Sequence, residues 1–118
     1  MPIKSASFIP YRVQVFLFSG RPDPEWTLSP DVSQQWEELW ANAALTGKEV
    51  QRPAVLGYTG CRLQLSGSGF WLVYNERVSY YDDNLLICKT DTNRRMEFLL
   101  LHSAPEETLH LLKQIRVI

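Results

Sequence analysis

The sequence lacks the charge pattern of a nucleic-acid-binding protein. It carries 12 Lys and Arg residues against 13 Asp and Glu residues, for a formal net charge of −1, and its longest basic run is Arg94-Arg95. Proteins that bind a duplex usually present a basic stripe, which displaces counterions from the phosphates. We therefore expect no nucleic-acid partner.

Long apolar runs and paired cysteines are missing as well. No apolar run approaches the roughly 18 residues of a membrane-spanning helix, and the N-terminal segment has no apolar signal-peptide core. We therefore expect a cytoplasmic protein with no membrane partner. Cys61 and Cys88 stand 27 residues apart, which matches neither a disulfide framework nor a CxxC zinc site. Both thiols are predicted to be reduced and buried.

The common motifs of catalysis and of metal or cofactor binding are absent. His102 and His110 belong to no HExxH motif, the 82–84 segment lacks the rest of a calcium loop, and no P-loop, dinucleotide fingerprint or serine elbow occurs. We expect no metal and no cofactor, and a binding protein rather than an enzyme. A Cys61 or Cys88 nucleophile served by His102 stays open, because catalytic partners need to be adjacent only in space.

What is present fits one folded domain. The chain has 118 residues, of which 45% are hydrophobic and 12% aromatic, including four Trp. That length suffices to bury a core, and the aromatic content predicts a well-filled core or a large aromatic contact surface. Residues 1–118 are predicted to form a single domain, with residues 1–10 as an extended arm.

The hydrophobic patterns predict an α+β fold. Ser29 is expected to cap a helix over residues 30–44 that docks through Trp36 and Trp40 and stops near Gly47. Strands are predicted at 12–18, 55–58, 61–65, 70–74, 78–81 and 85–89, with hairpin turns at 66–69 and 82–84.

Two helical patterns complete the chain. The one that follows Asp91 could also be a buried strand. The other follows a capping box at Ser103 and Glu106 and is expected to bury Leu109, Leu112 and Ile115. The whole is predicted as a mostly antiparallel sheet of four to six strands, covered on one side by the Trp-bearing helix and one or two C-terminal helices.

The segment SGRPDPEW, residues 19–26, is expected to be a rigid loop between the first strand and the first helix. Arg21 and Asp23 each precede a proline, so both are restricted to extended geometry. Arg21 could therefore be a pre-positioned fork for a carboxylate or phosphate, with Trp26 as a stacking surface. The alternative is structural: Arg21 pairs inside the protein and fixes the start of the helix.

The loop and a second motif carry a family resemblance. SGRPDPEW and the later LGYTG, residues 56–60, resemble small uncharacterised proteins, mostly bacterial, that bear an FSGRP[ND]PxW loop and an LGYxG turn. The likeness covers these two motifs and brings no known activity. It implies that the two loops meet in space.

Two functions are compatible with these features. The first is a binding or adaptor module that engages a protein partner, or a second copy of itself, through exposed aromatics and the proline-stiffened loop. The alternative is a small enzyme or a binder of small anionic ligands, with a pocket between residues 19–26 and 56–60. In that pocket Arg21 would hold the anion, Trp26 or Tyr58 would line the wall, and Asp23 is the fourth candidate binding residue.

Overall fold

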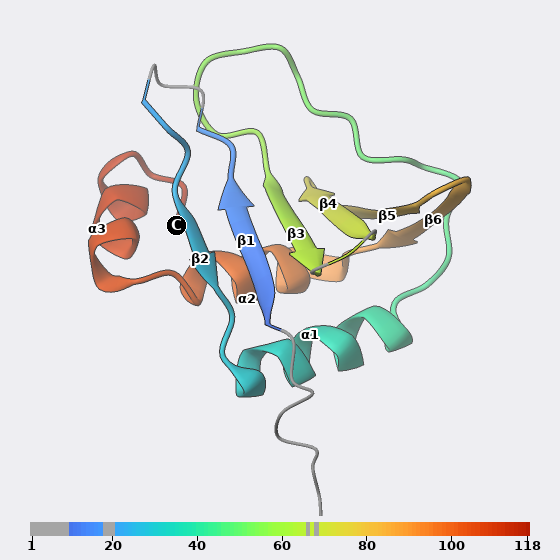
Figure 1. Cartoon of the computed structure of the whole chain (residues 1–118). Coiled ribbons are helices and arrows are strands. Elements are labelled where there is room, and N and C mark those ends of the chain that lie inside the picture. Colours follow the sequence, from blue (N-terminus) through green and yellow to red (C-terminus); the bar gives the residue numbers. More distant parts are fainter. Residues whose placement is uncertain (1–9, 18–20, 66, 68) are drawn as a thin grey trace, which may run out of the picture.

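The chain is built around one antiparallel sheet (Figure 1). The computed structural model describes residues 10–17, 21–65, 67 and 69–118. The six strands run in the order β2-β1-β3-β4-β5-β6, and all neighbours are antiparallel. Their bounds are β1 (Tyr11–Val15), β2 (Glu25–Thr27), β3 (Cys61–Leu65), β4 (Phe70–Tyr74), β5 (Arg77–Asp82) and β6 (Leu85–Thr90). The predicted α+β fold and its antiparallel sheet are confirmed.

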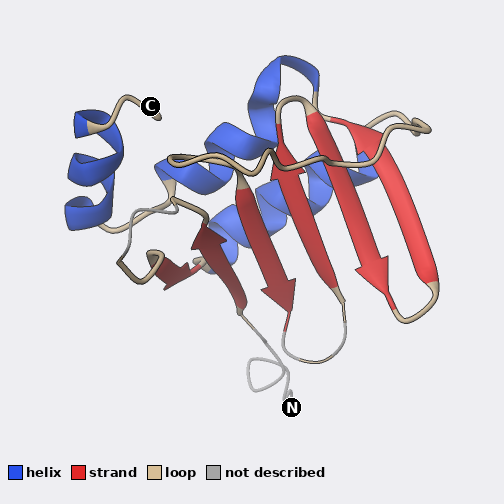
Figure 2. Cartoon of the chain, turned by 90° about the horizontal axis from the view of Figure 1, so that it is seen from above, coloured by secondary structure: helices blue, strands red, loops and turns tan. Residues whose placement is uncertain are grey.

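The helices lie on one face of the sheet and at one edge. Helices α1 (Pro30–Asn42) and α2 (Arg95–His102) lie under the sheet, while α3 (Glu106–Gln114) lies beyond β2 (Figures 1 and 2). A 3₁₀ turn, η2 (Thr92–Arg94), leads into α2. Ser29 caps α1 as predicted, because its hydroxyl accepts from the Val32 amide at 3.2 Å. Within the described ranges, no helix has the length and apolar character to cross a bilayer.

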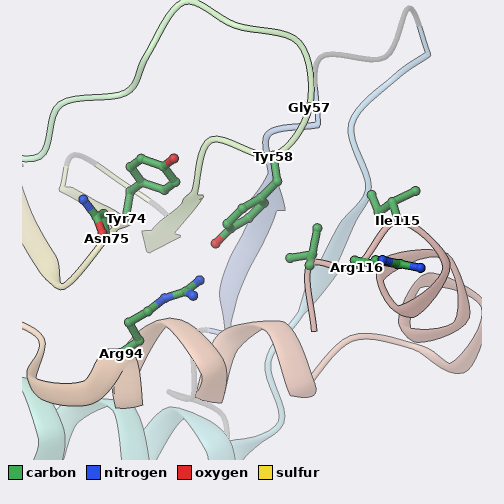
Figure 3. Close-up of a pocket in the computed structure, with 8 residues that line it drawn as sticks. Gly57, Tyr58, Tyr74, Asn75, Arg94, Ile115 and Arg116 are labelled. Carbon is green, nitrogen blue, oxygen red and sulfur yellow. The ribbon is translucent and has the colours of Figure 1, made fainter.

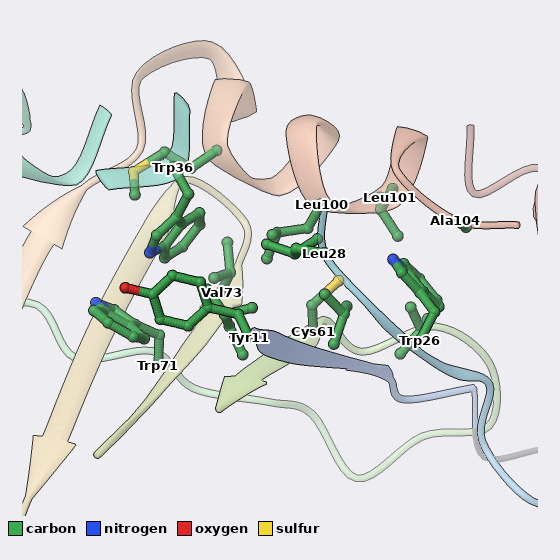
Figure 4. Close-up of a cluster of buried hydrophobic side chains, with 14 of the residues drawn as sticks. Tyr11, Trp26, Leu28, Trp36, Cys61, Trp71, Val73, Leu100, Leu101 and Ala104 are labelled. Carbon is green, nitrogen blue, oxygen red and sulfur yellow. The ribbon is translucent and has the colours of Figure 1, made fainter. Parts of the chain in front are cut away.

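The core forms between the sheet and these helices (Figure 4). Strand alternation places Val13, Leu63 and Trp71 on the helix-facing side, at paired positions of β1, β3 and β4. Trp71 packs edge-on against Trp36 of α1, with ring centroids 5.6 Å apart. At the other end of the core, Trp26 is buried near α2 and donates its indole N–H to Ser103 Oγ at 2.9 Å.

The connection between α1 and β3 wraps around the β6 edge and crosses the opposite face of the sheet (Figure 2). Thr46 N–H donates to the Cys88 carbonyl at the outer edge of β6, at 2.9 Å. Val50 N–H then donates to Ser79 Oγ at 2.8 Å, on the face away from the helices. The connection rejoins β1, where Thr59 N–H donates to the Phe16 carbonyl at 2.9 Å. This face is therefore covered by irregular chain.

The structure corrects several predicted element boundaries. Residues 55–58 form no strand but belong to the crossing connection, and α1 ends at Asn42 because the residues after it turn to pair with β6. β2 was not predicted. Parts of the 1–10 arm, of the 12–18 strand, of the 19–26 loop and of the 66–69 turn lie outside the described residues.

The start of α3 also differs from the prediction. Pro105 stands at the N-cap without a side-chain hydrogen bond. The Ser103 hydroxyl instead accepts from Trp26 and donates to the Leu100 carbonyl at 2.6 Å. The predicted capping box is therefore wrong, because a tertiary partner occupies the serine. Ile115 was predicted to be buried but is 46% exposed.

Candidate functional site

Residues 21–24, which we call the proline loop, are held in place by the carboxylate of Asp23 and the backbone carbonyl of Pro24. Asp23 accepts from the Leu17 amide at 3.0 Å and from the Gln14 side chain at 3.4 Å. Val15 N–H donates to the Pro24 carbonyl at 3.1 Å, so the loop is tied to the end of β1. These bonds and the two prolines restrict the backbone of residues 22–24, directly after Arg21.

Next to this loop lies a largely apolar cavity of about 520 Å³. Its walls come from the proline loop, the crossing connection and α3 with the residue after it; they are Leu17, Arg21, Pro22, Pro24, Leu56, Gly57, Leu111 and Ile115. Leu56 is 80% exposed at its rim. Residues of both SGRPDPEW and LGYTG therefore line one cavity, and this volume falls within the range of small-molecule sites.

Arg21 is the one charged side chain among these lining residues, and it is exposed. All 13 Asp and Glu residues lie in the described ranges, and none of them forms an ion pair with Arg21; the ion pairs found are Arg12–Glu25 and Arg94–Glu97. The guanidinium charge at this cavity is therefore not neutralised by a carboxylate of the described chain.

A second, more polar cavity of about 310 Å³ adjoins the first (Figure 3). The two share Gly57 and Ile115, and the polar cavity is further lined by Tyr58, Tyr74, Asn75, Arg94, Arg116 and Val117. Tyr58 and Arg94 approach each other across it from the crossing connection and the start of α2. Because they share these two residues, we call the two neighbouring cavities together the two-part cleft, with an apolar half and a polar half.

Beneath the polar half lies a fully buried carboxylate, Glu97. Arg94 donates to it through Nε and Nη2, both at 3.0 Å, and the Asn75 amide donates at 3.2 Å. The Tyr58 hydroxyl also donates to Glu97. Because a buried charge is tolerated only with such partners, Glu97 joins α2, the β4–β5 turn and the crossing connection at one point.

The chain enters α2 through an unusual backbone that presents Arg94 to Glu97. Asn93 and Arg94 both have left-handed φ values, 57° and 58°, which cost conformational energy in residues with a side chain. Asp91 supports the turn, accepting from the amides of Met96 at 2.7 Å and Glu97 at 2.9 Å. Asp91 therefore accepts from two amides of the first turn of α2 from before the 3₁₀ turn, although the N-cap position of the helix is Arg94.

Burial and ion pairing shift the pKa values of the groups around Glu97. Burial raises the pKa of Tyr58 far above its usual range, and its bonds to Cys61 and Glu97 add to the shift. The hydrogen bonds that Arg94 donates to Glu97 raise the pKa of Arg94. Burial also raises the pKa of Cys61 to about 12. Tyr58 is thus a neutral donor and Cys61 a neutral thiol near pH 7.

These values argue against a cysteine–histidine catalytic pair. The Cys61 thiol is buried beside Tyr58, and a thiol needs its thiolate form to act as a nucleophile. His102 is exposed and contacts the ring of Phe98, with centroids 6.1 Å apart. In the described part of the chain, no hydrogen bond joins His102 to either thiol. Cys88, predicted to be buried, is half-buried in β6.

The four residues predicted for the binding site are separated by the structure. Arg21 lines the apolar half of the two-part cleft and Tyr58 the polar half. Asp23 is half-buried and fastens the loop. Trp26 lies in the core, because the alternation of β2 turns its side chain toward α2 and away from the cleft. Trp26 is therefore not a stacking surface for a ligand.

Sequence reasoning missed Glu97, Arg94, Ile115 and Arg116 as site residues. Glu97 sits in the apolar run MEFLLL beside Met96, and an acidic side chain at a buried helical position is a signal that could have pointed to it. Arg94, Ile115 and Arg116 gave no comparable signal in the sequence, because these residues come together at the cleft only when the chain has folded.

Metal binding receives no support from the geometry of the described residues, among which no three His, Cys, Asp or Glu side chains gather as a metal site would require. The aromatic side chains of these residues are all buried or half-buried. The large apolar side chains that are exposed are aliphatic: Leu45, Val55, Leu56, Leu85, Leu86 and Ile115.

No protein-family model, curated protein or solved structure matches this chain.

Proposed function

We propose that this chain binds a small amphipathic anion in the apolar half of the two-part cleft. The observation that carries the proposal is Arg21, an exposed guanidinium without a carboxylate partner on the wall of an otherwise apolar cavity. Its charge suits a carboxylate or phosphate, which a guanidinium can bind through two parallel hydrogen bonds. The aliphatic walls suit an apolar body.

The hydrogen bonds of residues 23 and 24 strengthen this argument. Asp23 and Pro24, which follow Arg21 closely, accept from the amides of Leu17 and Val15 before any ligand arrives, so less conformational entropy is lost on binding. Leu56 and Ile115 are exposed at the cleft although both are apolar. An apolar ligand body would cover them and remove this surface from water, which is favourable at about 25 cal/mol per Å².

Decanoate is a suitable first probe, measured by isothermal titration calorimetry. We expect it to bind more tightly than decanol, which has the same chain without the charge. Arg21→Ala should weaken decanoate binding by about 10- to 100-fold, the usual effect of losing a charge-assisted hydrogen bond. Arg95→Ala is the matched control, because Arg95 is exposed and lines neither half of the cleft.

Two results would refute this function. One is equal affinity for decanoate and decanol, which would remove the role of charge. The other is unchanged decanoate affinity in Arg21→Ala with its melting temperature preserved. A large fall in the melting temperature of Arg21→Ala would instead support the structural role of Arg21.

A second candidate is self-association through the β6 edge. Leu85 and Leu86 are 52% and 46% exposed there, and Leu45 beside them is 76% exposed. The carbonyl of Cys88 and the amide of Thr90 point outward to residues 46 and 44. By the two-residue alternation of a strand, the backbone groups of Leu86 point the same way. A second copy could therefore add a strand at this open part of the edge.

Sedimentation velocity over a range of protein concentrations tests the second candidate. We expect a monomer–dimer equilibrium that Leu86→Lys shifts toward monomer, because a charge on an open edge disfavours pairing. A wild-type protein that stays monomeric at every concentration would eliminate it, and the first proposal would be unaffected.

A further inference from the structure

Two buried indole N–H groups lack an acceptor among the described residues. They belong to Trp36 of α1, which is fully buried, and to Trp71 of β4, which is 8% exposed. An indole nitrogen carries one hydrogen and is a donor only. Because a buried donor without a partner is costly, native proteins leave very few of them unpaired. Two such groups in neighbouring side chains therefore point to a bound acceptor.

Neighbouring rings hold Trp71 in its orientation. Its ring packs against four others, with centroid separations of 5.6 Å to Trp36, 5.8 Å to Tyr11, 6.0 Å to Trp40 and 4.6 Å to Tyr80. Three of these contacts are edge-on, so rotation of the Trp71 ring would drive it into a neighbour. The indole cannot turn toward a carbonyl elsewhere, and its acceptor has to reach it where it lies.

The third polar group at this place is the Tyr11 hydroxyl. Figure 4 shows the indole nitrogens of Trp36 and Trp71 turned toward the hydroxyl oxygen of Tyr11. That hydroxyl donates its hydrogen to Glu37 Oε2 at 2.7 Å, and its oxygen accepts no hydrogen bond from the described residues. We call the two indole N–H groups and this oxygen the indole–phenol cluster. It offers two donors and one acceptor.

The chemistry of the indole–phenol cluster selects a neutral occupant. A cation gains nothing from two N–H donors, and an anion would lie close to the Glu37 carboxylate that the same hydroxyl contacts. Burial, with the bond to Glu37, raises the pKa of Tyr11 above its usual range, so the phenol is neutral. The occupant must therefore accept two hydrogen bonds and donate one. Water can do both, and buried waters typically make about three hydrogen bonds.

We propose that the indole–phenol cluster is a binding site for one water molecule, which accepts from Trp36 and Trp71 and donates to Tyr11. This water adds hydrogen bonds between α1, β1 and β4 to the ring contacts that pack them together. None of the three residues lines either half of the two-part cleft, so the inference is independent of the proposed function.

A crystal structure of the full chain, at a resolution that shows ordered waters, tests the site directly. We expect one density peak that lies within about 2.7–3.2 Å of both indole nitrogens, the usual length of such hydrogen bonds. Trp26 is the internal control, because its indole N–H already donates to Ser103 Oγ at 2.9 Å and should have no water beside it. No peak, or a peak that reaches only one of the two nitrogens, would overturn the inference.

A bromide soak distinguishes water from an anion at the same place. Bromide gives an anomalous signal that water does not, so we expect no anomalous peak at the indole–phenol cluster. An anomalous peak within hydrogen-bond distance of Trp36 and Trp71 would show an anion site and would overturn the assignment to water.

Two variants assign the peak to the indole N–H groups. Trp71→Phe keeps an aromatic ring but removes one donor, and we expect loss of the peak. Trp40→Phe is the matched control, because Trp40 packs on the same ring of Trp71 but its nitrogen is not one of the two unpaired donors; the peak should stay. A peak that survives in Trp71→Phe, or one that both variants lose, would contradict the proposal. The wild-type crystal decides the question should Trp71→Phe fail to fold.

Discussion

Glu97 shows how one buried residue can organise a site without touching a ligand. Its carboxylate has no exposure to solvent, and it receives hydrogen bonds from Arg94, the Asn75 amide and Tyr58. These donors come from three separate segments of the chain. The position of Tyr58 on the cleft wall therefore depends on a residue that lies behind it.

Replacing Glu97 by glutamine tests this role. We expect Glu97→Gln to lower the free energy of unfolding by about 2–4 kcal/mol, because glutamine carries no charge and turns N–H donors toward the guanidinium donors of Arg94. Urea denaturation measures the change. Glu107→Gln is the control, since Glu107 is exposed in the first turn of α3, and it should leave stability near the wild-type value. Equal effects of the two substitutions would contradict the role of Glu97.

The sequence allowed part of the site to be predicted at the scale of residues. Arg21 could be singled out because prolines restrict its backbone, and Tyr58 because it belongs to the LGYTG motif of the family resemblance. Trp26 was wrongly predicted to be a stacking surface, because the sequence of a three-residue strand cannot be told from that of an exposed loop. The pairing of Glu97 with Arg94 was missed because it depends on two left-handed residues, Asn93 and Arg94 itself, that no sequence pattern marks.

At the scale of elements, the β6 edge illustrates how a sheet is protected by irregular chain. Thr46 N–H donates to the Cys88 carbonyl, and Thr90 N–H donates to the Ala44 carbonyl, both at 2.9 Å. Lys89 adds a bond to the Trp40 carbonyl at 2.7 Å and lies over the Trp40 ring. The C-terminal half of β6 is thus closed, which limits pairing with other chains.

Thr46→Pro should open this half of the edge, because proline lacks the N–H that reaches Cys88. We expect self-association above the wild-type level, seen as a larger weight-average mass in sedimentation velocity at high concentration. Thr46→Ala keeps the amide and should behave as wild type. If Thr46→Pro showed no additional association, the segment 44–46 would not be what guards the edge.

Elements that are determined by residues within their own segment were predicted correctly, whereas features that depend on distant parts of the chain were not. Strands at 61–65 and 70–74 and the hairpin of β5 and β6 were predicted because alternation and turn residues lie within each segment. The strand at 55–58 was wrong because the apolar side chains of Val55 and Leu56 remain exposed, Leu56 at the rim of the cleft, instead of facing a core. The capping box failed because Ser103 has a partner, Trp26, 77 positions away.

At the scale of the whole molecule, tyrosine burial sets a limit on alkaline stability. Burial raises the pKa of Tyr11, Tyr58 and Tyr81, which belong to β1, the crossing connection and β5. In each case the folded state favours the protonated phenol. Their contribution to stability is therefore fully present below the unfolded pKa of about 10 and is lost as pH rises through the folded pKa.

Of the three tyrosines, Tyr81 has the pKa that is easiest to measure. Burial, with a hydrogen bond to Glu49, raises its pKa from 10.0 to about 12. The stability difference between wild type and Tyr81→Phe should be constant below pH 10 and shrink between pH 10 and about 12. Ultraviolet absorbance of the phenolate, taken as the difference between the two proteins, should give a midpoint near 12. A midpoint near 10 would contradict the burial of this phenol.

The wrapping of the α1–β3 connection around the sheet also bears on the order of folding. Strands β3 to β6 form a continuous meander between residues 61 and 90, whereas β1 must pair with β3 across a separation of about 46 residues. Closing the larger loop costs more entropy, so the meander is expected to form early in the transition state and β1 to join late. The crossing connection can lie over the second face only once that face exists. The wall of the two-part cleft that bears Leu56 and Tyr58 would then be among the last parts of the molecule to assemble.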